Sequence, residues 1–151
     1  MDYQTKFNKR LNGFSLVELI VVLGIFFLIL GISTSVYSSF KSHNNLEITT
    51  SGIVEAIRFA QSSSQSGKGD SKWGVEVLPN EVVIFKGDSY LSRDILFNES
   101  LNFAGGISAS GLSEIVFEKI TGTTFNTGTI ILSNGSEIKS INVNEKGTVT
   151  Y

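Results

Sequence analysis

One residue in this sequence, Glu18, places an ionisable group within a long apolar run. Glu18 is the only charged residue in the nineteen-residue run from Phe14 to Ile32, which consists mostly of large apolar side chains. A carboxylate inside a membrane helix costs roughly 2.5–3.5 kcal/mol on insertion scales, so such a residue needs a partner or a task. A single copy of the run offers no cation of its own, whereas an assembly of several chains can supply one.

Residues for catalysis or metal binding are sparse elsewhere. The chain has one histidine, His43, and no cysteine, so neither a Cys/His dyad nor a typical zinc site can form. The stretch from Gly67 to Ser71 lacks the spacing of a phosphate-binding loop, and we interpret it as a flexible turn. Asp70, Asp88 and Asp94 lack the spacing of a calcium loop. We therefore expect no enzymatic activity and no cofactor.

The apolar run has the length of a membrane span. Nineteen residues at about 1.5 Å of helical rise approach the ~30 Å hydrocarbon thickness of a bilayer. Lys6, Lys9 and Arg10 precede the run, with Asp2 as the only acid among them. Since positive residues beside the first apolar helix stay in the cytoplasm, the helix is expected to insert once with its C-terminal end outward.

Three interpretations of this segment compete. A secretory signal peptide explains the basic start, but Ser33 to Ser35 match a small-residue cleavage site only weakly. A plain uncleaved anchor explains the apolar run and leaves Glu18 unexplained. A prepilin leader, cut before the apolar run, explains both features.

The third interpretation rests on a family resemblance. Gly13 followed by Phe14, with Glu18 fifth after that junction, resembles the class III signal of type IV pilins and type II secretion pseudopilins. The resemblance implies that a prepilin peptidase cuts between Gly13 and Phe14, and that the new amino group of Phe14 is then N-methylated. It also implies that Glu18 neutralises the amino terminus of a neighbouring subunit during assembly.

Periodicity predicts an α+β fold, with a long N-terminal helix packed on an antiparallel, β-rich C-terminal domain. We expect a leader over residues 1–13, a transmembrane or filament-core helix over 14–32, an amphipathic continuation over 33–66 and a globular domain over 67–151. The amphipathic part has an apolar stripe at three- to four-residue spacing. The stripe comprises Leu46, Ile53, Ile57 and Ala60, widened by Ile48, Val54 and Phe59.

Alternation and turn residues predict the strands of the globular domain. A hairpin is expected over 73–85, a short strand within 90–97 and a buried strand over 115–117. Asn134-Gly135 predicts a second hairpin, with arms 129–133 and 137–143 and a bulge in the second arm, before a last strand over 148–151. The passage from Leu101 to Ile107 shows no clear pattern. Trp73 and the phenylalanines are expected in the core.

A second resemblance concerns the subgroup. The stretch Ile53 to Gln61 and the pattern from Gly128 to the Val143-Asn-x-x-Gly147-x-Val ending are similar to GspH/FimT-type minor pseudopilins. This resemblance implies a low-abundance subunit near the filament tip that helps to initiate assembly. The implied partners are prepilin peptidase, other pilin or pseudopilin subunits, an assembly platform in the bacterial inner membrane, and membrane lipid. Some members of the family bind calcium, so the resemblance alone would allow a calcium ion here, but the sequence assigns no residues as its ligands.

Net charge separates the remaining hypotheses. The chain has 12 Lys or Arg against 14 Asp or Glu, and three of the basic residues precede Gly13. The part expected outside the membrane is therefore acidic, which disfavours a tip subunit that captures DNA, because nucleic-acid binding needs clustered Lys or Arg. The charge does not distinguish a minor subunit from a major pilin, an adhesive tip subunit or an anchored enzyme.

Overall fold

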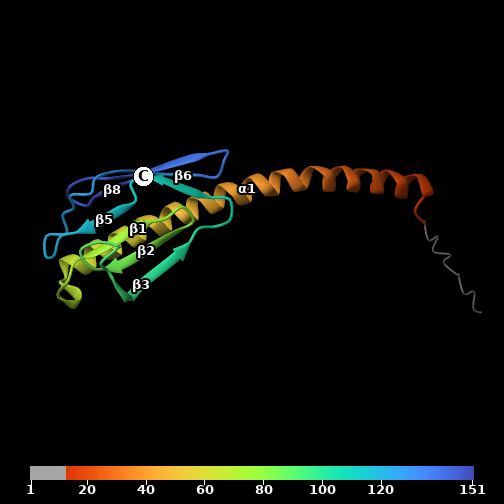
Figure 1. The fold of residues 1–151 in the computed structure, drawn as a ribbon. Coiled ribbons are helices and arrows are strands. Elements are labelled where there is room, and N and C mark those ends of the chain that lie inside the picture. The colour runs from red at the N-terminus through yellow and green to blue at the C-terminus, as the bar shows by residue number, and fades with distance from the viewer. Residues whose placement is uncertain (1–12) are drawn as a thin grey trace, which may run out of the picture. The chain divides into compact units, whose positions relative to one another are not determined.

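The computed structural model describes residues 13–151, and in residues 32–36, 38 and 39 it describes the backbone alone. The basic residues Lys6, Lys9 and Arg10 lie outside this range. The chain divides into two compact units, Met1–Ser38 and Ser39–Tyr151. Helix α1 (Leu16–Gln65) contributes residues to both units, and all strands belong to the second (Figure 1).

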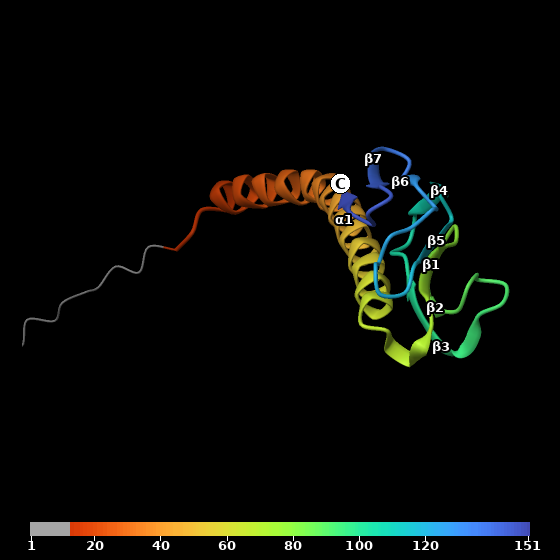
Figure 2. The same cartoon turned by 90° about the vertical axis from the view of Figure 1, so that its left-hand side faces the viewer.

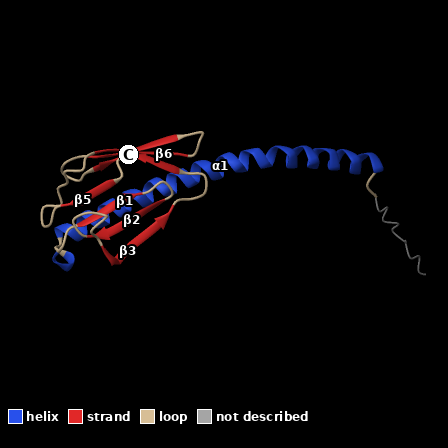
Figure 3. Cartoon of the chain, viewed as in Figure 1, coloured by secondary structure: helices blue, strands red, loops and turns tan. Residues whose placement is uncertain are grey.

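The second unit is α+β, as the sequence predicts. After a short 3₁₀ turn (Lys68–Asp70), its strands form two antiparallel four-stranded sheets (Figure 3). The first sheet has the order β3-β2-β1-β5, and its strands are β1 (Trp73–Val77), β2 (Glu81–Lys86), β3 (Asp94–Asn102) and β5 (Glu114–Phe117). The second has the order β4-β6-β7-β8, from β4 (Ser108–Gly111), β6 (Gly128–Ser133), β7 (Ile138–Val143) and β8 (Val149–Thr150).

The core of this unit lies between the C-terminal part of α1 and the two sheets (Figure 2). The helix contributes Leu46, Ile53, Ile57 and Ala60, which are at most 1% exposed, so the predicted stripe is confirmed at these positions. The sheets contribute alternate residues that face the helix. These are chiefly Trp73, Val75, Ile115 and Phe117 from the first sheet and Ile130, Leu132, Ile141 and Val143 from the second.

A buried serine joins the end of α1 to the first sheet. The Ser64 hydroxyl donates to the carbonyl of Phe117 at 3.1 Å and accepts the backbone N–H of Trp73 at 2.8 Å. Since a buried hydroxyl without partners would cost free energy, these two bonds make Ser64 compatible with the core.

Several strand predictions need correction. The strand expected within 90–97 is β3, which extends to Asn102 and includes part of the passage that showed no pattern. Eight of its nine residues are exposed, so alternation of buried and exposed residues could not mark it. No register shift occurs between β6 and β7, and the irregularity lies instead between β2 and β3, at Ile84 and Lys86.

Two other core predictions are wrong. Ile48 and Phe59 do not widen the buried stripe, because they are 61% and 38% exposed. Trp73, Phe85 and Phe117 are buried as expected, whereas Phe125 is 88% exposed.

A strained residue closes the C-terminal end of α1. Ile120 has a positive φ of 70°, an unusual conformation for a β-branched side chain, and its N–H donates to the Ser64 carbonyl at 3.0 Å. Because the Ile120 side chain is exposed, Ile120→Asn should relieve strain with little loss of packing. We expect a gain of about 1 kcal/mol in the free energy of unfolding, measured by urea titration of the full chain in detergent. Leu91→Asn, at an exposed turn residue without positive φ, should give no such gain; equal effects would contradict the strain argument.

Two glutamates face each other across β1 and β5. Glu76 is paired in register with Glu114, and its buried Oε2 accepts no hydrogen bond from the described residues. Burial raises the pKa of Glu76, Glu114 raises it further and Arg93 lowers it. Protonation of Glu76 therefore favours the folded state, so its contribution to stability falls as pH rises from the ordinary value of 4.5 through the raised pKa.

Replacing this carboxylate should remove the pH effect. We expect Glu76→Gln to raise the free energy of unfolding at pH 7 by up to about 1 kcal/mol, because it removes a like-charge cross-strand pair. The change of stability with pH above 4.5 should also become flatter than in the unmodified chain. Glu145→Gln, at an exposed position, serves as the control. An unchanged pH profile in Glu76→Gln would contradict this account.

Candidate processing and assembly site

The predicted cleavage junction lies immediately before the helix. Gly13 and Phe14 have no regular secondary structure, and α1 begins at Leu16. Phe14 is 84% exposed, and a Cβ built on Gly13 would meet no atom within 4 Å. Within the described part of the chain, packing therefore does not require glycine at this position. The absence of a side chain leaves the backbone open to close approach by an enzyme.

Glu18 lies in the first turn of α1 and is exposed. The described residues provide no hydrogen bond or ion pair to its carboxylate. The positive end of the helix dipole favours an acidic residue here. Ser15 and Glu18 also have the spacing of a capping box, but only the Ser15 carbonyl is engaged, accepting the Leu19 N–H at 3.1 Å.

The helix around Glu18 exposes a continuous apolar surface. Every large apolar residue of the described helix from Leu16 to Leu30 is at least 45% exposed. Soluble monomers rarely expose apolar patches of more than a few hundred Å², so this surface indicates contact with another protein or with lipid. Over the described residues, no helix meets the length and hydropathy expected of a membrane span.

Two other polar residues singled out in the sequence, His43 and Asp70, take part in surface ion pairs. His43 Nδ1 lies 2.8 Å from Glu137 Oε2 between α1 and the turn after β6, and both side chains are about half exposed. Asp70, in the predicted Gly67–Ser71 turn, pairs with Lys119, which lowers the pKa of the Asp70 carboxyl. No cluster of three potential metal ligands occurs among the described residues. Exposed pairs of this kind contribute little to stability.

Gln61 is a structural contact that the sequence did not predict. It extends from α1 to two loops, and its Nε2 donates at 2.9 Å both to the carbonyl of Gly122 and to that of Lys146. A glutamine on a helix surface gives no sequence signal of such a role, because the loops come together only in the folded domain.

Comparison with known proteins identifies one match. Residues 8–34 match the family model of the prokaryotic N-terminal methylation motif, a range that includes Gly13, Phe14 and Glu18. No curated protein and no solved structure matches the chain. The motif supports a relation to the type IV pilin and pseudopilin superfamily. It implies processing by a prepilin peptidase, a membrane-anchored subunit and assembly with other pilin subunits.

Proposed function

We propose that this protein is a minor pilin or pseudopilin, incorporated near the tip of a type II secretion pseudopilus or a type IV pilus, where it aids the initiation of assembly. Its role is structural rather than enzymatic, and it needs no cofactor. Before assembly the processed chain resides in the bacterial inner membrane as a single-pass protein, with its C-terminal domain on the extracytoplasmic side.

The arrangement of Gly13, Phe14 and Glu18 carries this proposal. An exposed junction precedes a helix whose first carboxylate, that of Glu18, lies in an exposed apolar surface without a partner among the described residues. Hydrolysis of the Gly13–Phe14 amide creates an ammonium group at the start of that helix. When processed helices pack together, the ammonium of one subunit can pair with Glu18 of another, and the low dielectric of their contact strengthens the attraction.

The minor role rests on the C-terminal unit. Its α+β architecture is consistent with a pilin-like fold, and the GspH/FimT-like pattern corresponds to β6, β7 and the turn before β8. In that pattern Gly147 has a conformational role: its φ is +73°, and its N–H donates to the Asn144 carbonyl at 2.8 Å. These features support the subgroup assignment.

Abundance and loss-of-function measurements test the minor role. The chain should be a small fraction of the pilin-like protein in sheared filaments, quantified by mass spectrometry with labelled peptide standards. Deletion of its gene should lower the number of filaments more than their mean length, because initiation rather than elongation is affected. A chain that forms most of the filament mass would contradict the minor role and identify a major pilin.

A further inference from the structure

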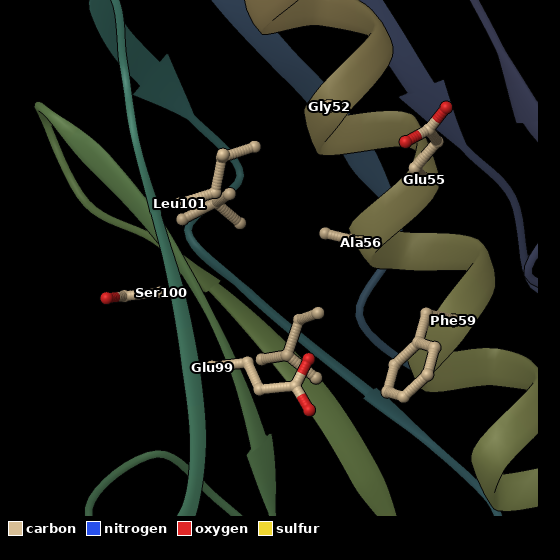
Figure 4. Close-up of a pocket in the computed structure, with 9 residues that line it drawn as sticks. Gly52, Glu55, Ala56, Phe59, Glu99, Ser100 and Leu101 are labelled. Carbon is tan, nitrogen blue, oxygen red and sulfur yellow. The ribbon is translucent and has the colours of Figure 1, made fainter.

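An apolar groove lies between α1 and β3 in the second unit. Its first hollow has a volume of about 260 Å³ and is lined from the helix by Gly52, Glu55, Ala56 and Phe59, and from the sheet by Val82, Ile84, Glu99, Ser100 and Leu101. Figure 4 shows Leu101 and Glu99 directed from β3 toward the helix, whereas Ser100 points away. A second hollow continues it along α1 and includes Glu47, Ile48 and Ser51.

The two hollows are small for a ligand pocket. Pockets for drug-sized molecules measure about 300–1,000 Å³, whereas the first hollow measures about 260 Å³ and the second about 370 Å³. The walls of the first hollow include Phe59 and Leu101, which are 38% and 46% exposed, and the second hollow adds Ile48. An apolar side chain seated here would remove these apolar surfaces from water, which is favourable.

Gly52 leaves room for Leu101 to pack close to α1. A Cβ at Gly52 would lie 2.6 Å from Leu101 Cδ2, so the Leu101 side chain would have to move if residue 52 carried one. Gly52, Glu55 and Leu101 line both hollows. Since β3 is the outer strand of its sheet, the groove is open on that side.

The charged residues that line the groove are all acidic. Glu47, Glu55 and Glu99 line the two hollows, and no Lys or Arg does. Glu47 Oε2 is already paired with Lys139 at 2.6 Å, and this pair lowers the pKa of Glu47. Glu55 and Glu99 form no ion pair within the described chain. Two unpaired carboxylates beside an apolar hollow are complementary to Lys or Arg next to an apolar side chain.

We propose that this groove binds a different subunit of the same assembly, through one large apolar side chain flanked by Lys or Arg. A different subunit is favoured over a second copy because most basic residues of this domain are already engaged. Lys72, Lys119 and Lys139 pair with acids, and Lys68, Lys86 and Arg93 lie over aromatic rings. The inference rests on the proposed function, because it identifies a partner surface for the assembled subunit.

Site-specific cross-linking tests the proposal. A photoreactive phenylalanine analogue replaces Ile48 in the full chain, in cells that contain the complete assembly system, and cross-linked peptides are mapped by mass spectrometry. We expect a cross-link to another subunit, in a segment with Lys or Arg beside a large apolar residue. The same analogue at Leu96, which is exposed on β3 but lines neither hollow, should not give this product.

Charge-reversal variants provide a second test of the proposal. Glu55→Lys combined with Glu99→Lys should lower the cross-link yield at least fivefold, whereas Glu145→Lys, outside the groove, should not. Thermal unfolding of each variant in detergent verifies that the domain remains folded. Cross-links only to lipid or to a second copy, or a yield unaffected by the double reversal, would overturn the proposal.

The N-terminus of each sample separates this inference from the proposed function. A processed chain without the cross-link would refute the groove alone. A cross-link in a chain that is never processed would retain the groove and refute the pilin-like function. Loss of both features would refute both.

Discussion

Replacing Glu18 with valine should leave cleavage at Gly13 intact and lower incorporation into filaments about tenfold or more. The substitution removes the one carboxylate of the apolar run from Phe14 to Ile32, so the amino terminus of a neighbouring subunit would lose its partner. An unpaired charge at a buried contact is costly, typically about 3–5 kcal/mol when one partner of a buried ion pair is removed. The measurement compares the amount of chain in sheared filaments with that in the membrane fraction.

Two further substitutions distinguish ion pairing from a local role in the helix. Glu18→Gln keeps the spacing and hydrogen-bonding groups of a capping box but removes the charge. If the carboxylate pairs with an ammonium group, Glu18→Gln should assemble as poorly as Glu18→Val. Leu19→Val introduces the same valine at the next position and should assemble normally. Normal incorporation of Glu18→Gln would contradict the ion-pair account and leave helix capping as the role of Glu18.

Replacing Gly147 with alanine should strongly destabilise the second unit. The residue has a φ of +73°, and a Cβ there would lie 2.8 Å from both the Gly122 carbonyl oxygen and Phe117 Cε1. The new methyl group would also displace the Gln61 side chain, which donates to the two loops. Backbone strain and overpacking each cost about 1–3 kcal/mol, so a total loss of about 3 kcal/mol is expected.

Gly135→Ala is the matched control for this prediction. Gly135 also has a positive φ, of 86°, but a Cβ there would meet no atom within 4 Å. Its substitution should therefore lower the free energy of unfolding only through backbone strain, by about 1–2 kcal/mol. Urea or thermal unfolding of the full chain in detergent, followed by circular dichroism, measures both variants. Equal destabilisation by the two substitutions would contradict a role for packing around Gly147.

Sequence patterns predicted the parts of the fold whose burial alternates. The stripe of Leu46, Ile53 and Ile57 and the hairpin of β1 and β2 follow from helical and strand periodicity, because one side of each element faces the core. The same patterns missed the extent of β3, whose residues are exposed on both faces. They also placed Ile48 and Phe59 in the core, because a sequence cannot show that these side chains line an open groove beside β3.

The sequence likewise predicted one candidate site and missed another. Gly13, Phe14 and Glu18 are close in sequence, so their spacing alone indicated the motif, and residues 8–34 match the corresponding family model. The groove between α1 and β3 could not be predicted, because Gly52 and Leu101 are distant in sequence and meet only through the fold. The contacts of Gln61 with the loops at Gly122 and Lys146 are long-range for the same reason.

The N-terminus of the mature chain is the most direct test of the central claim. The full chain is produced together with a prepilin peptidase, extracted from membranes and analysed by mass spectrometry, with Gly13→Arg as the control. We predict a chain that begins at N-methylated Phe14, and loss of this product in Gly13→Arg. An intact Met1 would indicate a simple anchor, and a start near Ser33 to Val36 would indicate a secreted domain. Either result would contradict the pilin-like function.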